Sequence, residues 1–238
     1  MAKEEILFNS QVALFFESPI FRPDQIYFDL TKAMPELDDS PLVVPVPNEQ
    51  QLYNVPVVSL KSKNSSVSVN IARARADIFI AGEGREKFDS KRDKIIEDVK
   101  SFFNYFYKLT KIKRIGFVTR FFVEDDDQDK SIERLLADQF KDLNEGSVHE
   151  AFVRYVTRIE NMSGFSVNNF TSVEKKLAKI KGVGDNVKGV LITRDFNTDP
   201  EQSYVGKFNA EIIEQFLNMS EQNFNLDKIK NILWPSEQ

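Results

Sequence analysis

Residues 89–123 read DSKRDKIIEDVKSFFNYFYKLTKIKRIGFVTRFFV. Large apolar side chains recur there at steps of three and four residues, namely Ile95, Ile96, Val99, Phe102, Phe103 and Phe106. This period predicts an amphipathic helix over 89–109 with one face directed at a core. The run 112–123 follows at once and is rich in β-branched and aromatic residues, so it predicts a strand.

More strands and helices are predicted on both sides of this helix–strand unit. Apolar alternation over 6–16 predicts a half-buried strand, and three prolines make 41–47 an extended surface crossing instead of a central strand. Further strands are expected at 55–61, 66–80, 150–160, 165–177 and 187–196, the second of these as one bent strand or as two. Further helices are expected at 23–34, 130–142, 207–222 and 226–233.

The order of these elements predicts an α+β protein. We expect two interlocked halves, 1–123 and 124–238, each a mostly antiparallel sheet backed by one long amphipathic helix. A single continuous domain is the alternative, because 238 residues fit either arrangement.

Composition excludes several classes of chemistry. The chain has no cysteine and a single histidine, His149, so thiolate zinc sites, disulfides, redox dithiols and two-histidine metal sites are excluded within one chain. No catalytic residue and no cofactor is predicted. No apolar run is long enough for a membrane span, and no signal peptide precedes the first strand, so we expect a cytoplasmic protein without a membrane contact.

Paired arginines on three expected strands form the main candidate binding surface. They are Arg73 and Arg75, Arg114 and Arg120, and Arg154 and Arg158, and each pair alternates so that both members share a sheet face. Such a surface would suit RNA, a nucleotide or another phosphate-bearing anion, with Phe117, Phe121, Phe122 and Tyr155 as stacking partners. The alternative is solvated or ion-paired arginines, which the net charge of −5 favours.

The acidic run 124–129 offers a metal site built on Asp125, Asp127 and Asp129. The calcium-loop pattern fails, however, because Lys130 replaces the required glycine and Leu136 the terminal glutamate. The favoured interpretation is a solvated loop in which Asp129 caps the following helix. The glycines of 182–184 precede a strand and not a helix, so they predict a connecting turn and not a phosphate loop.

Two remaining features bear on partners. His149 lies near a loop without a catalytic companion and is interpreted as a hydrogen-bonded or exposed bystander. The doubled phenylalanines at 15–16, 102–103 and 121–122 each place one ring on the minority face of their element. Such rings need a cover from the other half of the chain or from a partner, so a protein partner or a homodimer is expected.

The strand Arg114-Ile115-Gly116-Phe117-Val118, within this order of elements, resembles a sporadically distributed family of uncharacterised bacterial proteins of similar length. The resemblance implies a fold and an accessory role, such as one in mobile elements or phage defence, and it supplies no catalytic residues. We therefore expect a non-enzymatic binding or regulatory protein that acts through protein–protein contacts. The alternative is an RNA- or nucleotide-binding protein that uses the six arginines.

Overall fold

The computed structural model describes residues 3–136, 152–162, 164–202, 204–223 and 226–235. Its nine described strands form one antiparallel sheet in the order β2-β3-β4-β5-β1-β6-β9-β8-β7. The strands are β1 Glu5–Phe16, β2 Leu42–Val43, β3 Val58–Lys61, β4 Val67–Ile71, β5 Arg75–Ala81, β6 Ile112–Glu124, β7 Phe152–Met162, β8 Phe165–Ile180 and β9 Gly184–Thr198. The helices are α1 Tyr27–Ala33, α2 Phe88–Leu109, α3 Gln128–Glu133, α5 Ala210–Gln222 and α6 Asp227–Leu233, with 3-10 turns at Pro23–Gln25 and Gln50–Leu52.

The α+β class is confirmed, and the two predicted halves share one sheet. β6, from the first half, pairs with β9, from the second, over a run that aligns Gly116 with Asn197 and Glu124 with Gly189. Two separate sheets are therefore not confirmed. The predicted boundary at 123/124 falls at the end of β6 and stays a prediction.

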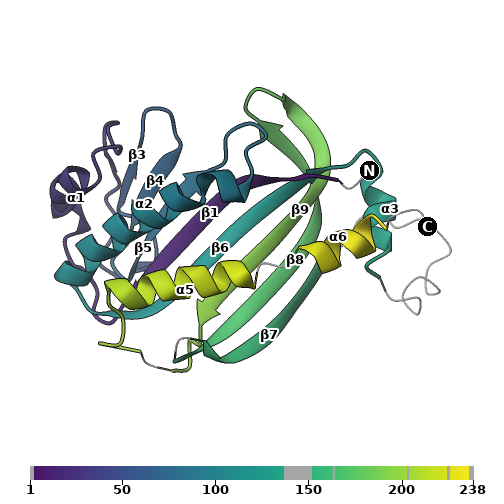
Figure 1. The fold of residues 1–238 in the computed structure, drawn as a ribbon. Coiled ribbons are helices and arrows are strands. Elements are labelled where there is room, and N and C mark those ends of the chain that lie inside the picture. Colours follow the sequence, from purple (N-terminus) through teal and green to yellow (C-terminus); the bar gives the residue numbers. More distant parts are fainter. Residues whose placement is uncertain (1–2, 137–151, 163, 203, 224–225, 236–238) are drawn as a thin grey trace.

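The helices cover one face of the sheet (Figure 1). α2 and α5 lie side by side across it, joined by ion pairs between Lys100 and Glu214 at 2.7 Å and between Arg92 and Glu221 at 2.6 Å. The apolar stripe of α2 predicted from the sequence faces the sheet, and Phe102, Phe103 and Phe106 are fully buried there. This covered face holds most of the hydrophobic core.

The doubled phenylalanines find their cover within the chain. Phe103 stacks on Tyr107 with ring centroids 5.5 Å apart. Phe122 is buried on the opposite sheet face in a small second cluster with Ile6 and Leu191. Phe15 lies beneath two arginines. These rings therefore give no support for a partner, and the homodimer stays a prediction.

Several predicted elements differ in detail. Of the two arrangements expected for 66–80, the structure shows two strands, β4 and β5, with residues 72–74 in the turn between them. Asp127, and not Asp129, is the N-cap of α3, and its side chain makes no capping hydrogen bond. Residues 137–142 of the predicted helix and His149 lie outside the described residues. Gly182, with a positive φ of 78°, lies in the predicted turn between β8 and β9.

Among the residues that the structure describes, no helix is long and apolar enough to cross a membrane.

Candidate functional site

The sheet face opposite α2 and α5, which we call the open face, carries a depression of about 370 Å³. Six neighbouring strands, from β5 through β1, β6, β9 and β8 to β7, supply its walls. Arg75, Arg114, Arg120 and Arg154, four of the six predicted arginines, line it. The remaining lining residues are Gln11, Ala13, Phe15, Gly116, Val118, Asn168, Phe170, Asp195, Asn197 and Pro200.

Strand register explains how arginines far apart in the sequence meet on one face. Arg120 on β6 is opposite Thr193 on β9, Thr193 is opposite Ser172 on β8, and Ser172 is opposite Arg154 on β7. Residues directly opposite each other in an antiparallel sheet project to the same side. Arg120 and Arg154 therefore belong to one cross-strand row.

Arg114 and Arg75 share a single aromatic ring. The guanidinium carbon of Arg114 lies 4.0 Å from the centroid of Phe15, and that of Arg75 lies 4.9 Å from it. Arg75 also donates its Nε to Asp77 at 2.9 Å and forms an ion pair with the same carboxylate. Among the described residues Arg114 forms no ion pair with a carboxylate, and its buried Nε has no hydrogen-bond partner. Burial and the charge of Arg75 lower the pKa of Arg114, although the charge of Asp195 acts in the other direction.

Arg154, at the far side of the depression, repeats this arrangement. Its guanidinium carbon lies 4.9 Å from the centroid of Phe170, which fixes the charged group over an aromatic surface. Within the described parts of the chain, neither Arg114 nor Arg154 makes an ion pair or a side-chain hydrogen bond. Both guanidinium groups thus keep donors that an incoming anion can occupy.

The guanidinium group of Arg120 uses part of its hydrogen-bonding capacity within the chain. Its Nη1 donates to Oδ1 of Asn9 at 2.9 Å, and burial lowers its pKa while Asp195 and Glu174 raise it.

Asp195 is a member of this site that the sequence patterns did not single out. Burial raises the pKa of its carboxyl group to about 6, although Asn197 donates a hydrogen bond to it and the charges of Arg120, Arg154 and Arg114 act in the other direction. Gly116 provides the space for Asn197, because a Cβ at residue 116 would come within 2.3 Å of the Asn197 Oδ1. The sequence offered one signal for Asp195, namely its position as an acidic residue inside the expected strand 187–196.

The two other predicted arginines have different roles. Arg73 is only 7% exposed and lies in the turn between β4 and β5, where it donates to the carbonyl oxygens of Val46 at 2.9 Å and Pro47 at 3.2 Å. The expectation that it shares a face with Arg75 is wrong, because the strand alternation does not extend through the turn. Arg158 is on the open face opposite Asn168, but it forms an ion pair with Asp199 at 3.2 Å.

The predicted aromatic platforms are also corrected. Phe117, Phe121 and Phe122 are all at most 3% exposed, so none offers a ring face to a ligand. The rings beside the arginines are Phe15 and Phe170 instead.

The three aspartates of the acidic run do not converge. Asp125 is buried and accepts hydrogen bonds from Lys3, Ser131 and the indole N–H of Trp234, which together outweigh burial and lower its pKa. Asp127 pairs with Lys130, and Asp129 pairs with Lys175. Among the described residues no group of three acidic or histidine side chains could hold a metal ion, so the structure does not assemble the hypothesised metal site.

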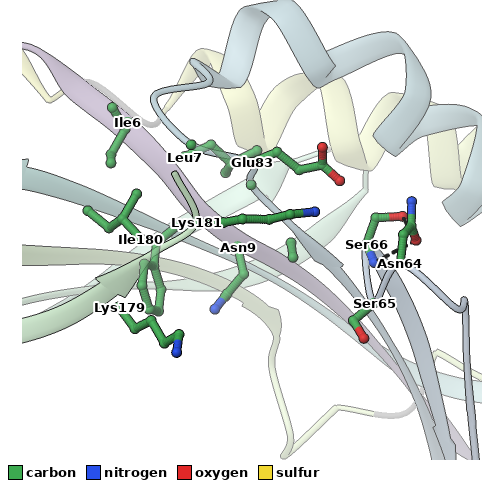
Figure 2. Close-up of a pocket in the computed structure, with 14 residues that line it drawn as sticks. Ile6, Leu7, Asn9, Asn64, Ser65, Ser66, Glu83, Lys179, Ile180 and Lys181 are labelled. Carbon is green, nitrogen blue, oxygen red and sulfur yellow. Dashed lines mark hydrogen bonds between the residues drawn. The ribbon is translucent and has the colours of Figure 1, made fainter. Parts of the chain in front are cut away.

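A second depression, of about 340 Å³, lies at one end of the sheet (Figure 2). Figure 2 shows Lys179 and Lys181 at its β8–β9 side and Asn64, Ser65 and Ser66 at the β3–β4 turn. Lys179 pairs with Asp185, and Glu83 adds an opposite charge at the rim. This depression therefore lacks the excess of one charge that distinguishes the open face.

Neither the protein-family models nor the curated proteins compared with this chain give a match.

The open face combines the features that an anion site requires. Four arginines and a single carboxylate line the depression, in a chain whose net charge is −5. Guanidinium groups donate hydrogen bonds in a planar fork that matches phosphate and carboxylate oxygens. The geometry can therefore hold an anion against Arg114 and Arg154 without displacing an existing ion pair.

Proposed function

We propose that this protein is a binding protein whose open face holds a phosphate-bearing ligand of nucleotide size. The observation that carries the proposal is the pair Arg114 and Arg154. Each is stacked on a phenylalanine, each lines the same depression, and each is without an ionic partner in the described chain. A cationic group held in this way is oriented before the ligand arrives, so less side-chain entropy is lost on binding.

Size and charge favour a small ligand over a long nucleic acid. The depression of about 370 Å³ is at the lower end of the range, roughly 300–1,000 Å³, in which proteins bind small molecules. The net charge of −5 opposes the counterion release that drives binding of a long polyanion. A local cluster of arginines can still attract a single nucleotide. Salt screens the more distant negative charges of the chain, so the electrostatic field at the depression is set mainly by the arginines close to it.

Titration with ATP, followed by calorimetry in low and moderate salt, tests the proposal. We expect saturable binding, and we expect Arg114→Gln and Arg154→Gln each to weaken it by about 10- to 100-fold, the loss of one charge-assisted hydrogen-bonding group. Arg22→Gln is the matched control. It removes the same charge from an exposed ion pair with Asp24 that does not line the depression.

Two other outcomes are informative. A short oligouridylate that binds through the same two arginines while ATP does not would favour single-stranded RNA as the ligand. Absence of binding by ATP, inorganic pyrophosphate and the oligouridylate would contradict an anion site on the open face.

A second candidate function is action through protein contacts, as a regulatory component of a bacterial mobile element or defence system in the cytoplasm. The family resemblance of the strand 114–118 motivates its biological setting. The exposed apolar residues Phe152, Tyr155 and Val156 on β7 favour the contact itself. An association that depends on these residues is the observation that would separate this candidate from the first.

A further inference from the structure

The two outer strands of the sheet differ in their ability to pair with another strand. β2 is only two residues long, and Pro41 and Pro45 flank it. Proline cannot donate to a strand ladder, and a short edge strand offers few backbone groups, so β2 is protected against further pairing. β7 has eleven residues, contains no proline, and pairs among the described strands with β8 alone.

β7 also exposes large apolar side chains. Phe152 is 57% exposed, Val156 48% and Tyr155 46%. Val156 projects to the open face, where it is opposite Phe170, and Tyr155 projects to the other side, opposite Thr171. Natural edge strands normally carry features that discourage association, such as charges, a proline, a bulge or a cover. β7 carries charged residues and a register irregularity between Ile159 and Met162, but its eleven residues also expose apolar side chains on both sides, so it is less protected than β2.

We infer that a second copy of this chain pairs with β7, strand to strand and antiparallel, about a two-fold axis at Thr157. Thr157 is the middle residue of Phe152–Met162, so this register overlaps the strand over its whole length, including the segment between Ile159 and Met162 where β7 shifts register against β8. It places Arg154 opposite Glu160 of the second copy, and Tyr155 opposite Ile159. Arg154 and Glu160 are both exposed, and Glu160 also accepts a hydrogen bond from Ser166 of its own chain. Opposite charges directly across a strand pair stabilise it.

Charge excludes the registers next to this one. An axis at Val156 would place Arg154 opposite Arg158 of the second copy, and an axis at Arg158 would place two copies of that arginine against each other. Like charges in direct opposition are destabilising. The register with the longest overlap therefore pairs opposite charges, whereas its two immediate neighbours pair arginine with arginine, and this self-complementarity is the reason for choosing a second copy over an unrelated strand.

The dimer has a geometric consequence for the open face. A two-fold axis perpendicular to the sheet keeps the open faces of both copies on the same side, so their two arginine depressions share one surface. Pairing along β7 rests on the edge and needs no ligand, but the chosen register uses Arg154, which also lines the depression.

Sedimentation velocity tests this inference, because it gives the mass in solution of the wild type and of two charge-reversal variants, each measured alone and mixed. Wild type is expected at twice the chain mass of 27.5 kDa. Arg154→Glu alone places two glutamates in opposition, and Glu160→Arg alone places two arginines in opposition, so each is expected to raise the dimer dissociation constant by about tenfold or more. Mixing the two variants restores opposite charges at both positions, and the dimer is expected to return as a heterodimer.

Leu42→Lys, on the outer strand β2, is the matched control and is expected to leave the dimer unchanged. Melting curves of each variant separate loss of pairing from loss of folding. A wild-type chain that stays monomeric at high concentration would overturn the inference. A dimer that ignores both charge reversals, or mixed variants that do not associate, would overturn the proposed register and with it the role of β7.

Discussion

The two faces of the sheet differ in the side chains that the same strands present to them. On the covered face, β1 places Val12, Leu14 and Phe16 under α2 and α5, where almost no solvent reaches them. On the open face the alternate positions of the same strand hold Gln11, Ala13 and Phe15 at the wall of the depression. Because successive side chains of a strand point to opposite faces, alternate residues of β1 contribute to the hydrophobic core and to the arginine-lined open face.

The contrast shows why the arginines are available. On the covered face the charged residue Arg194 is held by the side-chain oxygen of Asn169 at 3.1 Å and by the carbonyl oxygen of Asn223. On the open face none of the described helices supplies such acceptors, and the guanidinium groups of Arg114 and Arg154 lie over aromatic rings instead. Burial without a partner is costly for a charged group such as the partly buried Arg114, and a bound anion would offset that cost.

The largest effect is expected from truncation on the covered face. Phe106 is fully buried and contacts Phe16 and Phe102 at ring-centroid distances of 5.4 and 5.0 Å. Phe106→Ala is expected to lower the free energy of unfolding by about 3–5 kcal/mol, because it removes a buried ring and leaves a cavity. Urea unfolding measures this loss, and a change below about 1 kcal/mol would contradict the division between the two faces.

Asp195 allows a test of the open face through pH. Its pKa is about 6 in the folded chain and lies near 3.8 when unperturbed, so the folded state binds the proton more tightly between these values. The free energy of unfolding therefore falls as pH rises from about 4 to about 6. Above pH 6 the full free-energy cost of holding the ionised carboxylate in the folded protein is present. The maximum cost is about 3 kcal/mol at pH 8.

Asp195→Asn is accordingly expected to stabilise the protein at pH 8 and to have little effect at pH 4. Thermal unfolding of both proteins across this range measures the difference. The same variant is expected to bind ATP more tightly at pH 8, because it removes the one carboxylate that lines the depression among the described residues. A variant that is less stable than wild type at pH 8 would show that the three neighbouring arginines need this charge.

Substitution of Arg73 tests whether this arginine stabilises the fold without taking part in the proposed anion binding. Arg73→Ala leaves the carbonyl oxygens of Val46 and Pro47 without their donor and is expected to cost about 1–2 kcal/mol of stability. ATP affinity is expected to stay unchanged, because Arg73 does not line the depression. A loss of affinity equal to that of Arg114→Gln would return Arg73 to the binding surface and would contradict the assignment.

The smallest stability effect is expected from Arg154→Gln. Arg154 is exposed and makes no ion pair within the described chain, so its removal is expected to change the free energy of unfolding by less than about 0.5 kcal/mol. Denaturant titration provides the value. A larger destabilisation would mean that the side chain has a structural role, and its effect on ligand binding would then need a second variant.

Local patterns were sufficient for most elements. The three- and four-residue steps of the apolar residues in 89–109 predict α2 to within a residue at its start, and the alternation over 6–16 predicts β1. The single sheet was not predicted, because the pairing of β6 with β9 joins residues about 65 to 81 positions apart along the chain. No local period carries that information, since strand order depends on long-range packing.

The candidate site was predicted in part for the same reason. Arg114 and Arg120 share a strand, so alternation alone places them on one face. That Arg154 lies on this face depends on two intervening strands, β9 and β8, whose order the sequence does not show. Arg73 was misplaced because the alternation of alanine and arginine continues through a turn, and Asp195 was overlooked because burial, not spacing, gives it its unusual pKa.

The central claim is that an anion binds between the arginines of the open face. NMR of the arginine side-chain Nε–H groups during a titration with ATP tests it most directly, because each arginine reports separately. We predict that the signals of Arg114, Arg120 and Arg154 move together and saturate at one affinity, while those of Arg73 and Arg22 stay in place. Movement confined to arginines outside the depression, or no movement at any ATP concentration that saturates other nucleotide-binding proteins, would contradict the claim.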